Sequence, residues 1–283
     1  MTKERVARPR PVLRYHGGKW KLAPWIISHM PTHRVYVEPF GGGGSVLMRK
    51  PRPYGEVYND LWDTVVNVFR VLRDPAQACR LAHLLELTPY AREEFLDTYE
   101  DNLQDPIEEA RQTILRSFAG FGSAATSRSH MTGFRGNSNR SGTTPAQDWR
   151  NFPSHIPAFV DRLQGVVIEN RDAAVVIEQH DAPDALFYVD PPYPHVTRNY
   201  RRRNAAYAIE MTDADHEALA QQLREVDGMV MLSSYHSDLY DRLYGDWYSV
   251  ERNAHADGAQ DRVEVLWMNE ACAKQQSQAR LIA

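Results

Sequence analysis

The chain has 283 residues, of which 42% are hydrophobic and 25% are charged, and its formal net charge is −4. This composition excludes a fibrous or largely disordered protein, and the length suits one large domain or a domain with an insert. The net charge argues against coating of nucleic acid by the whole surface, but it is compatible with a local basic groove.

Cysteine usage and hydropathy narrow the class of protein further. Cys79 and Cys272 are the only cysteines, so neither a disulfide framework nor a zinc-type cluster is expected. The first ten residues are basic but lack the apolar core of a signal peptide. No apolar run approaches the roughly 18 residues that a membrane span needs. We therefore expect a protein of the reducing cytoplasm with no membrane partner.

A glycine turn precedes the first predicted helix. The segment Tyr15-His16-Gly17-Gly18-Lys19 permits a tight backbone turn, and apolar residues between Leu22 and Ile27 follow at helical spacing. The turn could bring Lys19 and an aromatic side chain to a ligand. Taken alone, it is more typical of a surface loop before a helix.

The first predicted strand, Val35 to Glu38, runs directly into the glycine-rich loop 39–45, and a helix is predicted from Val46 to Lys50. A strand, a glycine loop and a helix in this order present backbone N–H groups to a nucleotide-like ligand. The spacing matches neither the phosphate loop of nucleotide hydrolases nor a dinucleotide fingerprint. Because Glu38 would repel a phosphate, the loop favours a cationic ligand, such as an amino group or a sulfonium.

A second predicted strand ends in an acid. Asp60 follows the strand 56–59 and lies about 20 residues after the glycine loop, the offset of the acid that binds ribose hydroxyls in Rossmann-like sites. An amphipathic helix follows from Leu61 to Leu72, so Asp60 could also serve as its N-cap. The two roles are compatible.

The alternation of strands and helices is lost between residues 75 and 157. An acidic helical part comes first, and residues 120–151 are then rich in Gly, Ser, Thr and Asn. This second part carries arginines that could contact guanine edges or phosphates, among them Arg128, Arg135 and Arg140. A disordered solvated loop is the alternative, against which several aromatic residues argue.

The alternation resumes with a strand at 165–169, a polar turn that contains Asp172, and a helix at 173–180. The next strand, 186–189, is followed at once by Asp190-Pro191-Pro192-Tyr193. Prolines cannot donate to a sheet ladder, so this strand must stop at Asp190. The loop should therefore lie at the ligand-binding edge of an open α/β sheet. There a carboxylate and a proline carbonyl can hold an exocyclic amino group, and the tyrosine ring can stack on a base.

The remaining sequence completes the sheet. A polar loop to Tyr207 carries an arginine run that includes Arg198 and Arg201 and that could contact phosphates or form a solvated face. Thr212 can cap the next helix, and a strand at 229–233 and a short helix at 237–244 follow. A closing antiparallel hairpin, 247–252 with 262–268, precedes a tail that we expect to be frayed from Ala271.

In this order, the segments 15–19, 37–45, 59–60 and 190–193 resemble the alpha-class, Dam-type DNA adenine N6-methyltransferases. The resemblance implies an α/β fold, the Rossmann-like S-adenosylmethionine-dependent methyltransferase sheet, mostly parallel with an antiparallel last strand. It also implies that residues 1–74 and 158–283 form the catalytic domain. Residues 75–157 would be an inserted, mainly helical target-recognition domain.

The same resemblance implies S-adenosylmethionine as the cofactor, S-adenosylhomocysteine as the product, and no metal. The family commonly has Trp where this chain has Tyr15, a departure that keeps an aromatic face. Arg14 stands where relatives carry a basic residue able to reach DNA. The catalytic residues implied are Asp190, Pro191 and Tyr193. The residues expected to bind the cofactor are Tyr15, Lys19, Glu38, Phe40, Gly41, Gly43, Asp60, Asp172 and Asp190. The residues expected to bind DNA are Arg14, Arg128, Arg135, Arg140, Arg198 and Arg201.

The activity implied is methylation of adenine N6 in a specific double-stranded DNA sequence after base flipping, as in restriction–modification. We expect a monomer or weak dimer, associated with DNA in the cytoplasm of a bacterium or encoded by a phage or prophage. Asp rather than Ser at position 190 favours adenine by resemblance, with cytosine N4 in DNA or an amino group on RNA as alternatives. A DNA-binding regulator with little catalysis is another alternative, against which the set of Lys19, Asp60, Asp190 and Tyr193 argues. A nicotinamide oxidoreductase is disfavoured by the glycine spacing.

Overall fold

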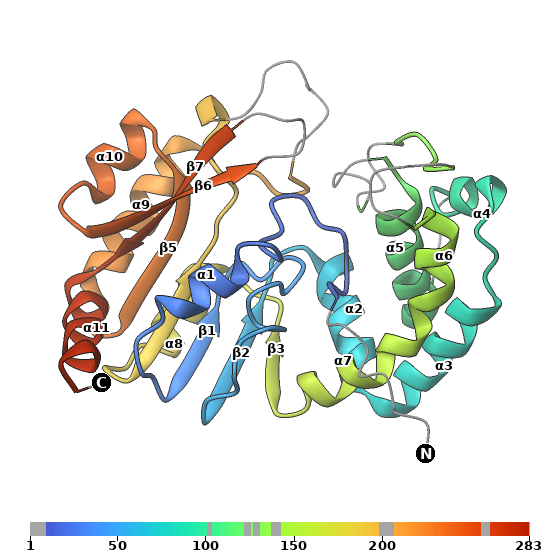
Figure 1. Ribbon diagram of the computed structural model, residues 1–283, viewed down its shortest axis with the longest axis horizontal. Coiled ribbons are helices and arrows are strands. Elements are labelled where there is room, and N and C mark those ends of the chain that lie inside the picture. The colour runs from blue at the N-terminus through green and yellow to red at the C-terminus, as the bar shows by residue number, and fades with distance from the viewer. Residues whose placement is uncertain are drawn as a thin grey trace.

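The structure, a computed structural model, describes residues 10–100, 104–121, 126, 131–136, 143–197, 207–255 and 261–282. Its strands are β1 (Val35–Glu38), β2 (Gly55–Asn59), β3 (Val166–Glu169), β4 (Ala185–Val189), β5 (Met229–Tyr235), β6 (Tyr248–His255) and β7 (Asp261–Met268). They form one sheet in the order β3-β2-β1-β4-β5-β7-β6 (Figure 1). The strands β1 to β5 are parallel, and β7 is antiparallel to both β5 and β6. The predicted fold class, a mostly parallel sheet with antiparallel last strands, is confirmed.

The strand order reverses beside β1. From β1 the chain builds outward to β2 and β3, and it then returns to place β4 on the other side of β1. In a doubly wound sheet, the crevice outside the carboxyl ends of the strands at such a switch point is where ligands bind. Glu38 ends β1, while Asp60 and Asp190 directly follow β2 and β4. The topology thus brings the three acids to one edge of the sheet.

Side chains alternate between the two faces of the sheet, and both faces are covered by helices. On β4, Leu186 and Tyr188 pack into one core, whereas Phe187 and Val189 pack into the other. The first core includes residues of α1 (Ala23–Ser28), α2 (Asp63–Arg73) and α11 (Glu270–Ile282). The second includes residues of α8 (Ala173–Gln179), α9 (Asp213–Glu225) and α10 (Asp238–Tyr244). Among the described residues, no helix has the length and apolar character needed to cross a bilayer.

The described parts of the chain between α2 and β3 are mainly helical and stand beside α2, away from the centre of the sheet (Figure 1). Its elements are α3 (Pro75–Leu87), α4 (Arg92–Asp97), α5 (Pro106–Ala119), α6 (Pro145–Asn151), the 3₁₀ turn η2 (Pro153–His155) and α7 (Ile156–Leu163). Aspartate or threonine caps followed by proline start α3, α5 and α6. The rings of Phe118, Trp149 and Phe152 pack together in a core continuous with that of α2. The described parts of 120–151 are therefore packed against the helices.

Two local predictions are wrong. Residues 46–50 form irregular turns rather than a helix, because the Leu47 N–H donates to Glu38 at 3.1 Å and Pro51 supplies no further donor. The residues after Asn269 form α11 instead of a frayed tail. The Asn269 side chain accepts from the Cys272 N–H at 3.0 Å, and Cys272 is fully buried. The predicted N-cap Thr212, by contrast, is confirmed, since it accepts from the Asp215 N–H. A 3₁₀ turn, η3 (His195–Thr197), follows the Asp190 loop.

A buried ion network joins the sheet, the turns after the glycine loop and the helical segment. The carboxylate of Glu56 on β2 lies 2.6 Å from Arg162 of α7 and 2.9 Å from Lys50. Arg162 also donates to the Leu47 carbonyl at 2.5 Å. Only 5% of Glu56 is exposed, so its charge depends on these two partners for compensation.

The substitution Arg162→Ala should lower the free energy of unfolding by about 3 kcal/mol, because the buried Glu56 carboxylate would lose its closest ion-pair partner. Urea denaturation followed by circular dichroism measures this loss. The matched control is Arg242→Ala, which breaks an Arg–Glu pair of the same 2.6 Å distance on the exposed surface. That control should cost less than about 1 kcal/mol. Equal losses would contradict a specific role of the buried network.

Candidate active site

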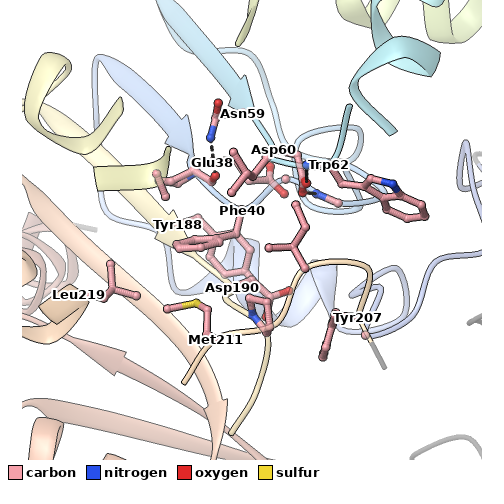
Figure 2. Close-up of a pocket in the computed structure, with 18 of the residues that line it drawn as sticks. Glu38, Phe40, Asn59, Asp60, Trp62, Tyr188, Asp190, Tyr207, Met211 and Leu219 are labelled. Atoms are coloured by element: carbon pink, nitrogen blue, oxygen red, sulfur yellow. Dashed lines mark hydrogen bonds between the residues drawn. The ribbon is translucent and has the colours of Figure 1, made fainter. Parts of the chain in front are cut away.

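A cleft of about 460 Å³ opens at the carboxyl ends of β1, β2 and β4 (Figure 2). This volume lies in the range typical of small-molecule sites. All residues expected to bind the cofactor line it, namely Tyr15, Lys19, Glu38, Phe40, Gly41, Gly43, Asp60, Asp172 and Asp190. They come from five separate stretches of the chain, which the switch point of the sheet brings together.

The glycine loop lets two tyrosine rings pack against its backbone. A side chain at Gly41 would overlap the ring of Tyr58. A Cβ at Gly43 would lie only 2.9 Å from the Cβ of Tyr15. Gly42 has a φ of 47°, a left-handed conformation that favours glycine. The Tyr58 hydroxyl donates to the Gly42 carbonyl at 2.7 Å. At Gly41, Gly42 and Gly43 the wall of the cleft is therefore formed by backbone alone.

Asp60 joins the glycine loop to the start of α2. Its carboxylate accepts from the backbone N–H of Gly42 at 2.7 Å and from that of Trp62 at 2.8 Å. Burial raises the pKa of Asp60, while these N–H donors act in the opposite direction. Asp60 is not the N-cap of α2, because Trp62 occupies that position. A carboxylate has about four lone-pair sites, so Asp60 can still accept hydrogen bonds from a ligand.

Glu38 is a buried acid that a cation would ionise. Only 2% of the residue is exposed, and its Oε2 accepts from the Tyr36 hydroxyl at 3.0 Å and the Leu47 N–H at 3.1 Å. Burial, together with the negative charge of Asp190, raises the pKa of Glu38 to about 8. A positive ligand in the cleft would favour its charged form.

Lys19 lies against Asp190, and both side chains line the cleft. Its Nζ is 2.9 Å from Asp190 Oδ1 and donates to the Gly17 carbonyl at 3.0 Å. Burial by itself would lower the pKa of Lys19, but Asp190 and Glu264 raise it above its usual value. Burial raises the pKa of Asp190, and the neighbouring ammonium opposes that shift. Lys19 is therefore charged and holds the Asp190 carboxylate in place.

The other residues of the Asp190 loop are less exposed. Pro192 lines the cleft, whereas Pro191 and Tyr193 are buried. The Tyr193 ring packs edge-on against Tyr235 at 4.8 Å between centroids, and only 4% of Tyr193 is exposed. Its hydroxyl donates to Glu264 of β7. The sequence analysis missed Glu264. An acid within the otherwise apolar run 263–268 was the available signal, because such a pattern indicates a buried carboxyl group.

Sequence reasoning also missed the side of the cleft that follows residue 206. Tyr207, Met211 and Leu219 are among the cleft residues labelled in Figure 2, and Glu210 and Asp215 also line the cleft. The Tyr207 ring lies 4.9 Å from that of His16. Asp172 caps α8 by accepting from the Ala174 N–H at 2.8 Å. Among the described residues that line the cleft, the acids outnumber the cations. The acids are Glu38, Asp60, Asp172, Asp190, Glu210 and Asp215, and the cations are Lys19 and Arg171.

The arginines expected to bind DNA lie apart from the cleft or outside the described residues. Arg14 forms an ion pair with Asp148 of α6 at 2.7 Å and lies over the Phe118 ring at 4.8 Å. It therefore connects the N-terminal segment to the helical segment. Arg135 is partly exposed, and its backbone N–H donates to the Ala119 carbonyl at 2.7 Å. The remaining candidates, Arg128, Arg140, Arg198 and Arg201, lie outside the described residues.

Comparison with known proteins connects this geometry to a family. Residues 15–256 match the profile of the D12 class N6 adenine-specific DNA methyltransferases. The chain is 24% identical to the Type II methyltransferase M.MjaIII of Methanocaldococcus jannaschii, over 92% of this chain and 99% of that protein. It is 25% identical to the Type II methyltransferase M1.LlaDCHI of Lactococcus lactis subsp. cremoris, over 84% of this chain and 85% of that protein.

The variant Glu38→Gln should be more stable than the wild type at alkaline pH. The folded-state pKa of Glu38, about 8, exceeds the ordinary value of 4.5, so the folded protein holds this proton more tightly than the unfolded chain does. The stability that Glu38 contributes is complete below pH 4.5 and is lost as the pH rises through 8.

Glutamine cannot ionise and can still accept from Tyr36 and Leu47. We expect Glu38→Gln to raise the free energy of unfolding at pH 9 by about 2–4 kcal/mol, with little change at pH 5. Thermal unfolding of the ligand-free protein at the two pH values measures the difference. A variant no more stable than the wild type at pH 9 would contradict a carboxyl group that resists ionisation.

Proposed function

The chain belongs to the D12 class N6 adenine-specific DNA methyltransferases, and we propose that it methylates adenine N6 with S-adenosylmethionine, in a specific double-stranded sequence and after base flipping. The observation that carries this proposal is the position of Asp190, which lies at the end of β4 and lines the same cleft as the glycine loop. The description of its relatives as Type II methyltransferases supports a role in restriction–modification.

The cleft fits S-adenosylmethionine in shape and charge. A wall of glycine backbone admits close approach of a ligand, and the excess of acids favours a sulfonium and an ammonium over a phosphate. Glu38, Phe40, Gly41 and Gly43 would hold the methionine part beside Tyr15 and Lys19. Asp60 would bind the ribose hydroxyls with its remaining lone pairs, and Asp172 would lie near the adenine ring of the cofactor.

The chemistry of the Asp190 loop follows from the weak nucleophilicity of an aromatic amine, whose lone pair is delocalised into the ring. When bound, S-adenosylmethionine supplies an electrophilic methyl group. The Asp190 carboxylate and the Pro191 carbonyl would accept hydrogen bonds from the two N–H groups of adenine N6. These two hydrogen bonds would draw the nitrogen toward tetrahedral geometry and free its lone pair. Positioning and electrostatics of this kind can supply most of the rate enhancement.

Tyr193 would stack on the extruded base and recover part of the stacking lost on flipping, a few kcal/mol. The ring is 4% exposed in this structure. Stacking therefore requires that the groups covering the ring move aside when the base enters. The edge-on contact with Tyr235 fixes the plane of the ring from the other side.

Residues 75–157 are proposed to form the target-recognition domain, and the remainder, residues 1–74 and 158–283, the catalytic domain. The helices α3 to α6 stand outside the layers that cover the sheet, on the far side of α2 (Figure 1). Arg135 lies in this segment with Arg128 and Arg140, and Arg14 contacts it through Asp148. Arginine side chains of this kind would position DNA through its phosphates and read base edges.

Replacement Asp190→Asn should reduce methyl transfer at least about 100-fold, because the amide accepts the N6 hydrogens without a full negative charge. Transfer of labelled methyl groups to DNA measures the loss, and mass spectrometry of digested DNA identifies N6-methyladenine. Cofactor binding, measured by calorimetry with S-adenosylhomocysteine, should persist. Asp246→Asn, at an exposed pair with Arg224, is the matched control and should leave transfer unchanged. Near-wild-type transfer by Asp190→Asn would eliminate this mechanism.

Alanine substitutions at Arg128, Arg135 and Arg140 should weaken DNA binding and leave S-adenosylhomocysteine binding intact. Each lost phosphate contact should reduce the slope of log affinity against log salt by about 1, whereas a lost base contact should relax the sequence preference. Binding isotherms between low and physiological salt, together with a map of methylated sites, separate the two outcomes. Unchanged affinity and site preference would show that these arginines do not contact DNA.

A further inference from the structure

Glu264 is a buried charge in the last strand pair that the proposed mechanism leaves unused. It lies on β7, only 1% of it is exposed, and its neighbours along the strand include Val265 and Leu266 of the two cores. The antiparallel register places Glu264 opposite Tyr235, near the carboxyl end of β5. Burying a carboxylate is costly unless charged or hydrogen-bonding partners compensate it.

The partners of Glu264 are the residues of the reaction centre. Its Oε1 accepts from the Tyr193 hydroxyl and lies 3.6 Å from Lys19 Nζ. The same ammonium lies 2.9 Å from Asp190 Oδ1 and 4.6 Å from the centroid of the Tyr193 ring. Two carboxylates, Asp190 and Glu264, therefore share one positive charge.

This sharing affects how well Asp190 can accept a hydrogen bond from a substrate. A carboxylate attracts an ammonium more strongly than it attracts a neutral N–H donor, because the ammonium carries a full positive charge. An amino group of a base is neutral and would compete poorly for a carboxylate that held Lys19 alone. A second carboxylate attracts the ammonium toward itself and keeps the net charge of the group negative.

We propose that Glu264 is a positioning residue for methyl transfer, which fixes the Tyr193 hydroxyl and shares Lys19 so that the Asp190 carboxylate remains available to the amino group of the substrate base. This role rests on the proposed function of Asp190. Glu264 is not among the described residues that line the cleft, and it would act through Lys19, which does line it, and through Tyr193.

The arrangement has a signature in the pH dependence of catalysis. The negative charge of Glu264 favours the protonated form of Asp190, so its removal should lower the pKa of Asp190. The acid limb of the pH profile of kcat, in which kcat rises with pH, would then move to lower pH. Among the described residues, the titratable groups that interact with Asp190 or Glu264 are Lys19, Glu38, Tyr15, Tyr188, Tyr193, Tyr235 and Tyr240. All of them are present in the variants compared below.

The test is Glu264→Gln in the full chain, with kcat and KM measured from pH 5 to 9 by transfer of labelled methyl groups to DNA. We expect kcat at pH 7.5 to fall by about 10-fold to 100-fold. The acid limb should shift to lower pH, and KM for S-adenosylmethionine should change little. A fall in kcat without a shift of the acid limb would mean a merely structural role and would overturn the proposal.

Two further variants keep the test decisive. Glu264→Asp withdraws the carboxylate by one methylene, and we expect a smaller shift in the same direction; an unmoved limb in this variant would overturn the proposal even if Glu264→Gln fails to fold. Glu56→Gln is the matched control, because Glu56 is likewise a buried glutamate on a strand with a basic partner at 2.9 Å. It should lose stability without moving the acid limb.

The two proposals fail in different ways. A wild-type protein that transfers no methyl group to adenine would overturn the proposed function and this role with it. Methylation that depends on Asp190 but proceeds at the wild-type rate and with the wild-type pH profile in Glu264→Gln would overturn the role of Glu264 alone.

Discussion

The ion pair between Lys19 and Asp190 is the contact around which the site is arranged. It joins the first glycine turn to the carboxyl end of β4 across 2.9 Å. Both side chains are largely buried, so each charge depends on the other for compensation. The glycine loop lies on one side of this pair and β7 on the other. The ammonium thus holds a carboxylate ionised and oriented in a place where burial alone would favour its protonated form.

The buried acids of the cleft lower the stability of the ligand-free protein when they ionise. Glu38, with a pKa of about 8, resists ionisation because it is buried and lies near the negative charge of Asp190. Asp60 is partly buried, and two backbone N–H groups stabilise its charge. Such local conflicts between stability and charge are characteristic of functional sites. The buried pairs of Glu56 serve a different purpose, since they join β2, α7 and the turns after the glycine loop.

The helical segment and the sheet share one core rather than meeting through a flexible connection. Phe118 and Phe152 pack in the same cluster as the residues of α2. Arg14 extends from the N-terminal segment to Asp148 and lies over Phe118. The Thr126 hydroxyl donates to the carbonyl of Arg14 at 3.2 Å, and Arg14 stands five residues before Lys19 in the chain. The segment proposed to read DNA is therefore packed against the stretch of chain that leads to the reaction centre.

The sequence by itself determined the strand ends, because their signals are local: β4 ends just before Asp190 and the two prolines, and a glycine-rich loop follows Glu38 at the end of β1. It also predicted that Glu38, Asp60 and Asp190 meet in one cleft, since parallel strands place their carboxyl ends at one edge. It did not predict the side of the cleft that follows residue 206. Only the tertiary structure decided the place of Glu264, which meets Lys19 because β7 inserts antiparallel beside β5. Packing likewise made α11 a helix. Contacts of this kind depend on the pairing of distant segments, which no local periodicity encodes.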